Sequence, residues 1–128
     1  MVYECLFCDL QLNDRVRIIA ENELAYLVRD GYPVRDGHTL VIPKRHAVDY
    51  FDLFENEVLA INELLLEQRL LLTATDPSIE GFNIGMNCGE VAGQSVFHCH
   101  VHLIPRRRGD VAEPRGGVRN VIPGRGNY

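Results

Sequence analysis

Three of the five histidines in this chain are concentrated in five positions near its C-terminal end. His98, His100 and His102 alternate strictly with apolar residues. Because successive side chains of a strand point to opposite faces, the three imidazoles are predicted to line one face while the residues between them face a core. Imidazole titrates near neutral pH, attacks electrophiles and binds metals, so chemistry is expected on this strand.

The spacing limits what the three histidines can do together. On a straight strand the first and the third would lie roughly 13 Å apart, at about 3.3 Å per residue. Zn–N bonds are only about 2.0–2.1 Å long, so one ion could accept two neighbouring histidines but all three only with strain. We therefore expect a division of labour rather than a single three-histidine metal site. The alternative is a row of polar positions on a wet strand.

The four cysteines include one closely spaced pair, Cys5 and Cys8. In a reducing compartment a Cys-x-x-Cys pair indicates metal binding or redox chemistry before a disulfide framework. Cys99 alternates with the histidines and is predicted to be a buried apolar filler. Cys88 lies in a glycine-rich stretch and suggests no role.

Length and composition indicate a single globular domain over residues 1–128, with 46% hydrophobic and 24% charged residues. No apolar run is long enough to span a membrane, and the N-terminus lacks the pattern of a signal peptide. We expect a cytoplasmic protein without a membrane partner. The net charge of −5 offers no basic field for nucleic acid. The arginines at 106–108 form a local cluster, either in a solvated loop or on a phosphate.

Strand-like segments dominate the rest of the chain. One helix over residues 52–75 interrupts them, which favours an α+β fold with an antiparallel sheet. The glycine- and proline-rich residues 109–128 are predicted to form an extended tail that packs on the domain or on a second copy. The predicted strands span residues 17–20, 24–28, 38–42, 81–87 and 96–104.

The long helix is predicted to start at Asp52 as N-cap, with Glu55 three residues on. Its apolar face is broad because leucines occupy 64–66 and 70–72. A face of that width fits a helix that lies on a sheet and also touches a partner subunit. The stripe expected to face the sheet comprises Phe54, Val58, Ile61, Leu65 and Leu72.

The segment His98-Cys99-His100-Val101-His102-Leu103-Ile104 matches the motif His-φ-His-φ-His-φ-φ, where φ is apolar. With it, the chain resembles the histidine triad (HIT) family of nucleotide hydrolases and transferases. The resemblance implies a HIT-like fold: a five-stranded antiparallel sheet, one long helix, a short N-terminal helix or turn, and commonly a homodimer. Supporting segments, in family order, are Cys5-x-x-Cys8, residues 37–46, Asn87 and Gly93-Gln94-Ser95.

In that family the central histidine, here His100, is the nucleophile. Its lone pair would attack phosphorus and form a nucleotidyl-histidine intermediate, provided that the other ring nitrogen donates to a backbone carbonyl. His102 corresponds to the histidine that stabilises the phosphate oxygens. Ser95 and Gln94 match positions that touch the phosphate and the leaving group, and Ser95 would help to protonate that group. Gly93 would let the backbone approach the phosphate.

Two further residues match nucleotide contacts of the family. Asp30 lies sixteen residues before His46, the spacing of the ribose-binding acid, although Arg-Asp-Gly alone is also an ordinary turn. Asn87 matches a ribose or phosphate contact, with a loop-capping asparagine as the alternative.

Some relatives and the related hexose-phosphate uridylyltransferases bind zinc through two cysteines and two histidines. The corresponding residues here are Cys5, Cys8, His46 and His98. Four protein ligands leave no position for water, so this zinc would be structural and would pin the N-terminus to the catalytic strand. Free buried thiols are the alternative.

The resemblance implies a nucleotidyl hydrolase that cleaves at the α-phosphate of a purine nucleotide derivative. Candidate substrates are a nucleoside phosphoramidate, an adenylate and a dinucleoside polyphosphate. Uridylyltransferases usually show His-Pro-His without a third histidine, so His102 favours the hydrolase branch. The alternatives are a nucleotidylyl transferase or phosphorylase with the same intermediate, a non-catalytic nucleotide-binding zinc protein, and a metal-dependent hydrolase with zinc at the triad.

Overall fold

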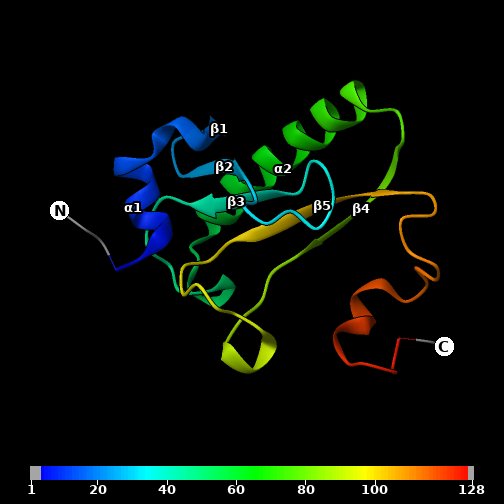
Figure 1. Ribbon diagram of the computed structural model, residues 1–128. Coiled ribbons are helices and arrows are strands. Elements are labelled where there is room, and N and C mark those ends of the chain that lie inside the picture. The colour runs from blue at the N-terminus through cyan, green and yellow to red at the C-terminus, as the bar shows by residue number, and fades with distance from the viewer. Residues whose placement is uncertain (1–3, 127–128) are drawn as a thin grey trace.

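A computed structural model of the chain describes residues 4–126. Its centre is a five-stranded antiparallel sheet with the strand order β1-β2-β3-β5-β4 (Figure 1). The long helix α2 covers one face, and the short helix α1 lies at the N-terminal end, so the predicted α+β fold is confirmed. The elements are α1 (Leu6–Asn13), β1 (Ile18–Glu21), β2 (Ala25–Arg29), β3 (Thr39–Pro43), α2 (Glu55–Thr75), β4 (Ile79–Gly85) and β5 (Val101–Arg107), with short 3-10 turns at Arg15–Arg17, Tyr50–Asp52, Glu90–Ala92 and Gly117–Val121.

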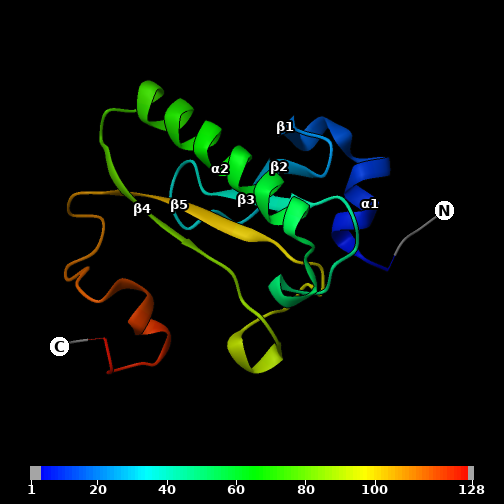
Figure 2. The same cartoon turned by 180° about the vertical axis from the view of Figure 1, so that it is seen from behind.

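Both faces of the sheet are covered near β2, and alternate side chains of this strand enter different clusters. Tyr26 and Val28 pack with Phe7 and Leu10 of α1. Their neighbours on the other face, Ala25 and Leu27, pack with Ile61 and Leu64 of α2. Figure 2 shows from behind how α2 lies over this face of the sheet. A strand buried on both faces loses the apolar–polar alternation of a half-exposed strand.

Helix α1 is fixed to the sheet by polar contacts as well as by packing. The Tyr26 hydroxyl donates to the Phe7 carbonyl at 2.7 Å, and the Gln11 amide donates to the Lys44 carbonyl at 2.9 Å. Burial raises the pKa of Tyr26, so its hydroxyl stays a donor at neutral pH. These bonds hold α1, with Cys5 as its N-cap, against β2 and against the residue that follows β3.

Helix α2 starts later than predicted. Residues 50–52 form a 3-10 turn, and the N-cap is Phe54 rather than Asp52. Glu57, not Glu55, reaches back to the Phe54 N–H at 2.8 Å. Glu57 also accepts two hydrogen bonds from the Arg45 guanidinium, at 3.0 and 2.8 Å. The helix start is therefore set by the local contact of Glu57 with the Phe54 N–H together with an ion pair to Arg45, which local sequence does not reveal.

The buried stripe of α2 also differs from the prediction. Of the five residues expected to face the sheet, Ile61 and Leu72 are buried, whereas Phe54 is exposed. Leucines on several sides of the helix hide which side faces the sheet, and two polar residues complete the stripe. The buried residues are Glu57, Ile61, Leu64, Gln68 and Leu72, and exposed leucines are Leu59, Leu66, Leu70 and Leu71.

The fifth strand runs over Val101–Arg107 rather than 96–104, so of the triad only His102 lies within it. Pairing with β3 ends at Val41 and Val101. Before that point the chain leaves the ladder, and the Cys99 N–H donates to the Ala47 carbonyl at 2.7 Å in the loop after β3. The prediction that all three imidazoles line one strand face is therefore wrong.

The chain after β5 turns back below β4 and β5 (Figure 1). Asp110 closes the turn by accepting two hydrogen bonds from the Arg106 guanidinium, each at 2.7 Å. Within the predicted tail 109–128, residues 117–121 form a 3-10 turn rather than extended chain, and residues 127–128 lie outside the described range. Within residues 4–126, no helix is long and apolar enough to cross a membrane.

The pairing between Arg45 and Glu57 yields a prediction about stability. Glu57→Gln leaves the guanidinium without its buried carboxylate and is expected to lower the free energy of unfolding by about 1–3 kcal/mol at pH 7. The contacts lower the pKa of Glu57 below its ordinary value of 4.5, chiefly through the Arg45 hydrogen bonds. Their stabilising effect is therefore complete above that pH and is lost as the pH falls through the folded-state pKa.

Urea unfolding of the wild type and two variants measures this difference. Glu63→Gln, at an exposed position of the same helix, is the matched control and should change the free energy by less than about 0.5 kcal/mol. Equal effects of the two substitutions would contradict the assigned role of Glu57.

Candidate functional site

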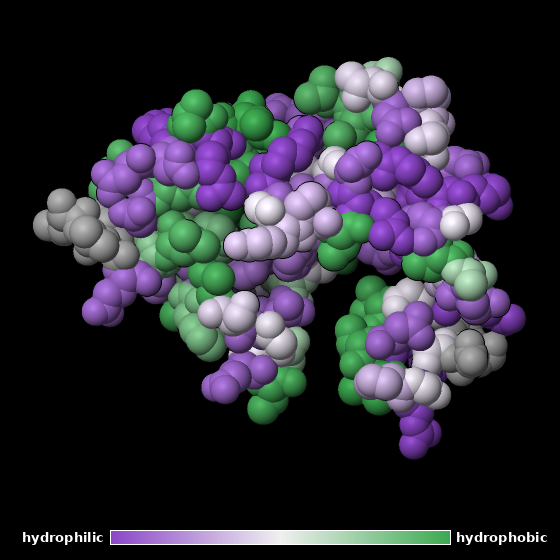
Figure 3. Space-filling model, viewed as in Figure 1, coloured by the Kyte–Doolittle hydropathy of each residue, from purple (hydrophilic) through white to green (hydrophobic). Residues whose placement is uncertain are grey.

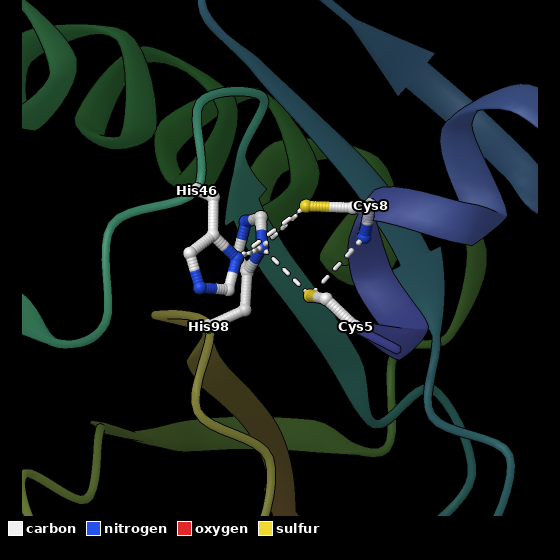
Figure 4. Close-up of side chains that lie close together, drawn as sticks. All are labelled: Cys5, Cys8, His46 and His98. Atoms are coloured by element: carbon white, nitrogen blue, oxygen red, sulfur yellow. Dashed lines mark hydrogen bonds between the residues drawn. The ribbon is translucent and has the colours of Figure 1, made fainter. Parts of the chain in front are cut away.

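Two cysteines and two histidines converge where α1 meets the end of β3 (Figure 4). One ligand-type atom from each residue lies within 4.8 Å of the others. The Nδ1 atom of His98 is 3.3 Å from the Cys5 sulfur, 3.5 Å from the Cys8 sulfur and 3.2 Å from Nδ1 of His46. The structure thus brings together all four predicted metal ligands: Cys5, Cys8, His46 and His98.

Each of these side chains is held by its own element. Cys5 caps the N-terminus of α1 and accepts the Cys8 N–H at 3.4 Å. His46 follows Arg45, which the contact with Glu57 fixes. The His98 ring is fully buried, and its Nε2 atom donates to the Pro43 carbonyl at 2.7 Å.

The geometry and the donor set fit a tetrahedral zinc ion. Bonds of about 2.0–2.3 Å at tetrahedral angles place neighbouring ligand atoms roughly 3.3–3.8 Å apart, close to the observed separations. With its proton on Nε2, His98 presents a lone pair at Nδ1, the arrangement typical of a metal-bound histidine. Burial lowers the pKa of His98 to about 4, so the ring is neutral at pH 7.

The surroundings of Cys8 favour its protonated thiol. Burial, reinforced by the hydrogen bond to Cys5 and by its charge, raises the pKa of Cys8 to about 11. A bound divalent ion reverses this effect because a coordinating thiol is deprotonated. The four residues therefore suit a closed structural zinc site, with no position left for water.

His100 lies just outside this cluster with one ring nitrogen committed. Its Nδ1 atom donates to the His98 carbonyl at 2.8 Å, so a neutral ring has its lone pair on Nε2. The edge of the Phe7 ring lies against the imidazole, with ring centroids 5.1 Å apart. The predicted hydrogen bond from His100 to a backbone carbonyl is therefore present, and its role as nucleophile stays a prediction.

His102 belongs to a second group of side chains, with Asp30 and His38. Its Nδ1 atom is 2.9 Å from Nε2 of His38, and Asp30 Oδ2 is 3.4 Å from the same His38 nitrogen. The carboxylate lies 4.0 Å from His102 Nδ1, beyond hydrogen-bond distance. Burial first, then the neighbouring His100 and His38, lowers the pKa of His102 to about 4, so the ring is neutral at pH 7.

The loop before the triad is organised by Gln94. Its buried side chain accepts the Gly89 N–H at 2.8 Å and donates to the carbonyls of Val48 and Val96. Gly93 has φ of +98°, a left-handed conformation that only glycine adopts without strain. Gln94 therefore shapes the loop with its side chain, and its predicted contact with a nucleotide stays a prediction.

Asn87 and His102 meet at one cavity of about 510 Å³ between β4–β5 and the tail. Figure 3 shows this hollow, with hydrophobic surface on the side of the tail that faces it. Asn87 is exposed there, and Ser95 is exposed on the loop that leads to His98. The apolar part of the wall includes Ile84, Ile104, Met86, Val111, Val118 and Val121.

Sequence reasoning missed two residues of this site. The sequence placed His38 only at the start of the predicted strand 38–42, but its side chain is buried and contacts both Asp30 and His102. The pairing of the two strands around residues 30–38 would have indicated this contact. The Asp30 N–H donates to the His38 carbonyl, which places the two residues opposite each other. Phe7, between the two cysteines, gave no signal of its contact with His100.

Comparison with known proteins agrees with this geometry. A family model described as HIT domain matches residues 11–109. The chain belongs to the HIT family. This match confirms the resemblance inferred from the triad and its flanking segments. The family includes nucleotide hydrolases and transferases.

Three relatives illustrate the range of the family around this HIT protein. An uncharacterized HIT-like protein from Mycoplasma genitalium is 44% identical over 104 residues, which cover 80% of this chain and 72% of the relative. An AP-4-A phosphorylase from Mycobacterium tuberculosis is 36% identical over 97 residues, 73% of this chain and 48% of that enzyme. A Zn-bound histidine triad protein from Mycobacterium smegmatis superposes with a TM-score of 0.73, at 37% identity over 86% of this chain and 80% of that one.

Proposed function

We propose that this HIT protein is a nucleotidyl hydrolase that cleaves at the α-phosphate of a purine nucleotide derivative through a nucleotidyl-His100 intermediate. The orientation of His100 supports this function best. Its Nδ1–H is bound to a backbone carbonyl, which leaves Nε2 with a lone pair beside the cavity-lining His102. A phosphoramidate, an adenylate or a dinucleoside polyphosphate would each present a suitable phosphorus atom.

In the first step Nε2 of His100 attacks phosphorus, and the bond from phosphorus to the leaving group breaks with its electron pair. The leaving group takes a proton, for which Ser95 is the proposed donor. The ring becomes positively charged when Nε2 bonds to phosphorus, and the His98 carbonyl at 2.8 Å stabilises that charge through Nδ1–H. Water then attacks phosphorus and gives one proton back to Ser95, while the electron pair of the P–N bond returns to Nε2.

The other site residues are assigned to binding. His102 would donate to a non-bridging phosphate oxygen, and Asp30 would accept hydrogen bonds from the ribose hydroxyls. Asn87, Gly93 and Gln94 complete the proposed nucleotide contacts. The Asp30 carboxylate is suited to binding the ribose because it is only partly exposed and lies near His102, the proposed phosphate contact.

A phosphorylase is the second candidate, since one relative is an AP-4-A phosphorylase. It would use the same intermediate with phosphate instead of water as the acceptor, so the product would be a nucleoside diphosphate rather than a monophosphate. A non-catalytic nucleotide-binding zinc protein is the third.

Substitution of His100 tests covalent catalysis. We expect wild-type enzyme mixed briefly with adenosine phosphoramidate or a diadenosine polyphosphate to gain the mass of one AMP, and His100→Ala to gain none. Loss of the nucleophile should lower turnover by at least about 10³-fold. Intact-mass spectrometry and product analysis, with and without added phosphate, separate AMP from ADP and so the hydrolase from the phosphorylase.

Nucleotide binding to His100→Ala, measured by calorimetry, is the control for folding. Turnover that survives in His100→Ala would refute the nucleophile. Nucleotide binding without turnover by the wild type would favour the non-catalytic alternative.

Zinc is proposed as a structural cofactor held by Cys5, Cys8, His46 and His98. When bound there it would supply cross-linking of α1 to the segment before β5, not a reactive water. Thiolate ligands also suit a reducing cytoplasm, which is the proposed location.

Metal removal tests this role. We expect one zinc per chain by elemental analysis, and a chelator should lower the thermal midpoint together with activity. Cys8→Ser should lose the metal, while Cys88→Ser, the control, should keep it. Chelation that abolishes activity without any loss of stability would point instead to a catalytic metal.

We also propose a homodimer, and no nucleic-acid or membrane partner. Leu59, Leu66 and Leu70 recur at helical spacing on the outer side of α2 and are more than half exposed, and the edge strand β4 exposes Ile84. A second copy of the chain would cover such a stripe by two-fold symmetry.

Light scattering on a sizing column tests the homodimer. The wild type is expected at twice the mass of the chain, and Leu66→Glu at the mass of one chain because it places a charge in the leucine stripe. Leu12→Glu is the matched control, since Leu12 is similarly exposed on α1 and its substitution should leave the dimer intact. A monomeric wild type would refute the homodimer.

A further inference from the structure

His38 is a buried histidine with both ring nitrogens in contact with polar groups. The Val34 N–H donates to Nδ1 at 3.2 Å, and Nε2 lies 2.9 Å from Nδ1 of His102. The side chain is 4% exposed, so water cannot easily replace either contact. These two contacts determine where the proton of each imidazole sits.

The Val34 contact places the His38 proton. A nitrogen that accepts an N–H must present a lone pair, so the neutral ring has its proton on Nε2. In the charged ring two N–H groups would face each other across 3.2 Å. Burial also lowers the pKa of His38, in the same direction.

The His38 proton in turn determines that of His102. Nε2–H of His38 has two acceptors in reach: His102 Nδ1 at 2.9 Å, and Asp30 Oδ2 at 3.4 Å, so the shorter contact is to the imidazole. Nδ1 of His102 therefore accepts. A neutral His102 must then have its proton on Nε2, on the far side of the ring from His38.

We propose that His38 is a positioning residue that holds His102 in the Nε2–H tautomer. It does so through two consecutive hydrogen bonds, from the Val34 N–H to His38 and from His38 to His102. His100 is held in the opposite tautomer by the His98 carbonyl. One ring thus presents a lone pair to phosphorus and its neighbour presents a donor to a phosphate oxygen. The role at the phosphate rests on the proposed function, whereas the tautomer itself does not.

The same contact argues against a metal between Asp30, His38 and His102, although their ligand atoms lie within 4.8 Å of one another. A metal bound to Nε2 of a neutral His38 would require the proton on Nδ1. That proton would point at the Val34 N–H. A hydrogen-bonded pair satisfies all these atoms, and a metal ion does not.

NMR of the zinc-loaded protein labelled with ¹⁵N histidine tests the tautomer directly at pH 7. Long-range ¹H–¹⁵N correlations distinguish a protonated from an unprotonated ring nitrogen. The wild type is expected to show His102 protonated on Nε2 and unprotonated on Nδ1. A spectrum with the proton on Nδ1 overturns the proposal without any variant or substrate.

Two substitutions separate the contacts of His38. His38→Gln places an amide donor near the position of Nε2 and should keep the His102 tautomer and most of the rate. His38→Asn reaches only the position of Nδ1, so it keeps the acceptor for Val34 but loses the donor to His102. We expect mixed tautomers in His38→Asn and formation of nucleotidyl-His100 slowed by roughly 10–100-fold.

Identical His102 spectra in the two variants overturn the proposal, as does a His38→Gln variant with the rate and tautomers of His38→Asn. If no variant and no wild-type protein reacts with nucleotides, the proposed function fails, while the spectra still decide the tautomer.

Discussion

The hydrogen bond from His100 to the carbonyl of His98 is the contact on which the site depends. The position of the His98 carbonyl sets the direction of this bond. The His98 backbone is in turn fixed because both nitrogens of its imidazole ring have partners. Nε2 meets the Pro43 carbonyl at the end of β3, and Nδ1 meets the cysteine pair at the start of α1. One residue thus joins the sheet, the N-terminal helix and the proposed nucleophile, His100.

This arrangement solves an electrostatic problem. Several imidazoles lie close together. Two protonated rings would repel each other, and protonation of any one ring would remove a lone pair that acts as an acceptor or a nucleophile. Burial lowers the pKa of His98 and His102 to about 4, so both are neutral at pH 7. With charge removed, the direction of each N–H decides what each ring does. Backbone carbonyls orient His98 and His100, whereas the His38 side chain orients His102.

Sequence reasoning predicted the parts of this site that depend on spacing along the chain. The alternation at 98–102 and its flanking segments carried the resemblance to the HIT family, and that resemblance implied the right fold and the four side chains that converge, Cys5, Cys8, His46 and His98. Sequence reasoning failed where a contact between distant segments decides. The triad leaves the sheet before His102 because the Cys99 N–H bonds to Ala47, and α2 starts at Phe54 because Glu57 pairs with Arg45. Neither choice leaves a periodic signal.

The reacting groups and the walls of the cavity have different structural origins. His98 and His100, just before β5, are positioned by bonds to backbone carbonyls, and His102, within β5, by its contact with His38. The cavity beside His102 is instead built from β4 and from the tail after β5. The tail contacts the sheet through exposed or half-buried side chains, with the turn at Arg106 and Asp110 as its anchor. A change in the tail can therefore alter which group fits beside His102 and leave the contacts of His100 in place. Under the proposed function, the triad supplies the shared chemistry, and this wall is where selection among phosphoramidate, adenylate and polyphosphate substrates is expected.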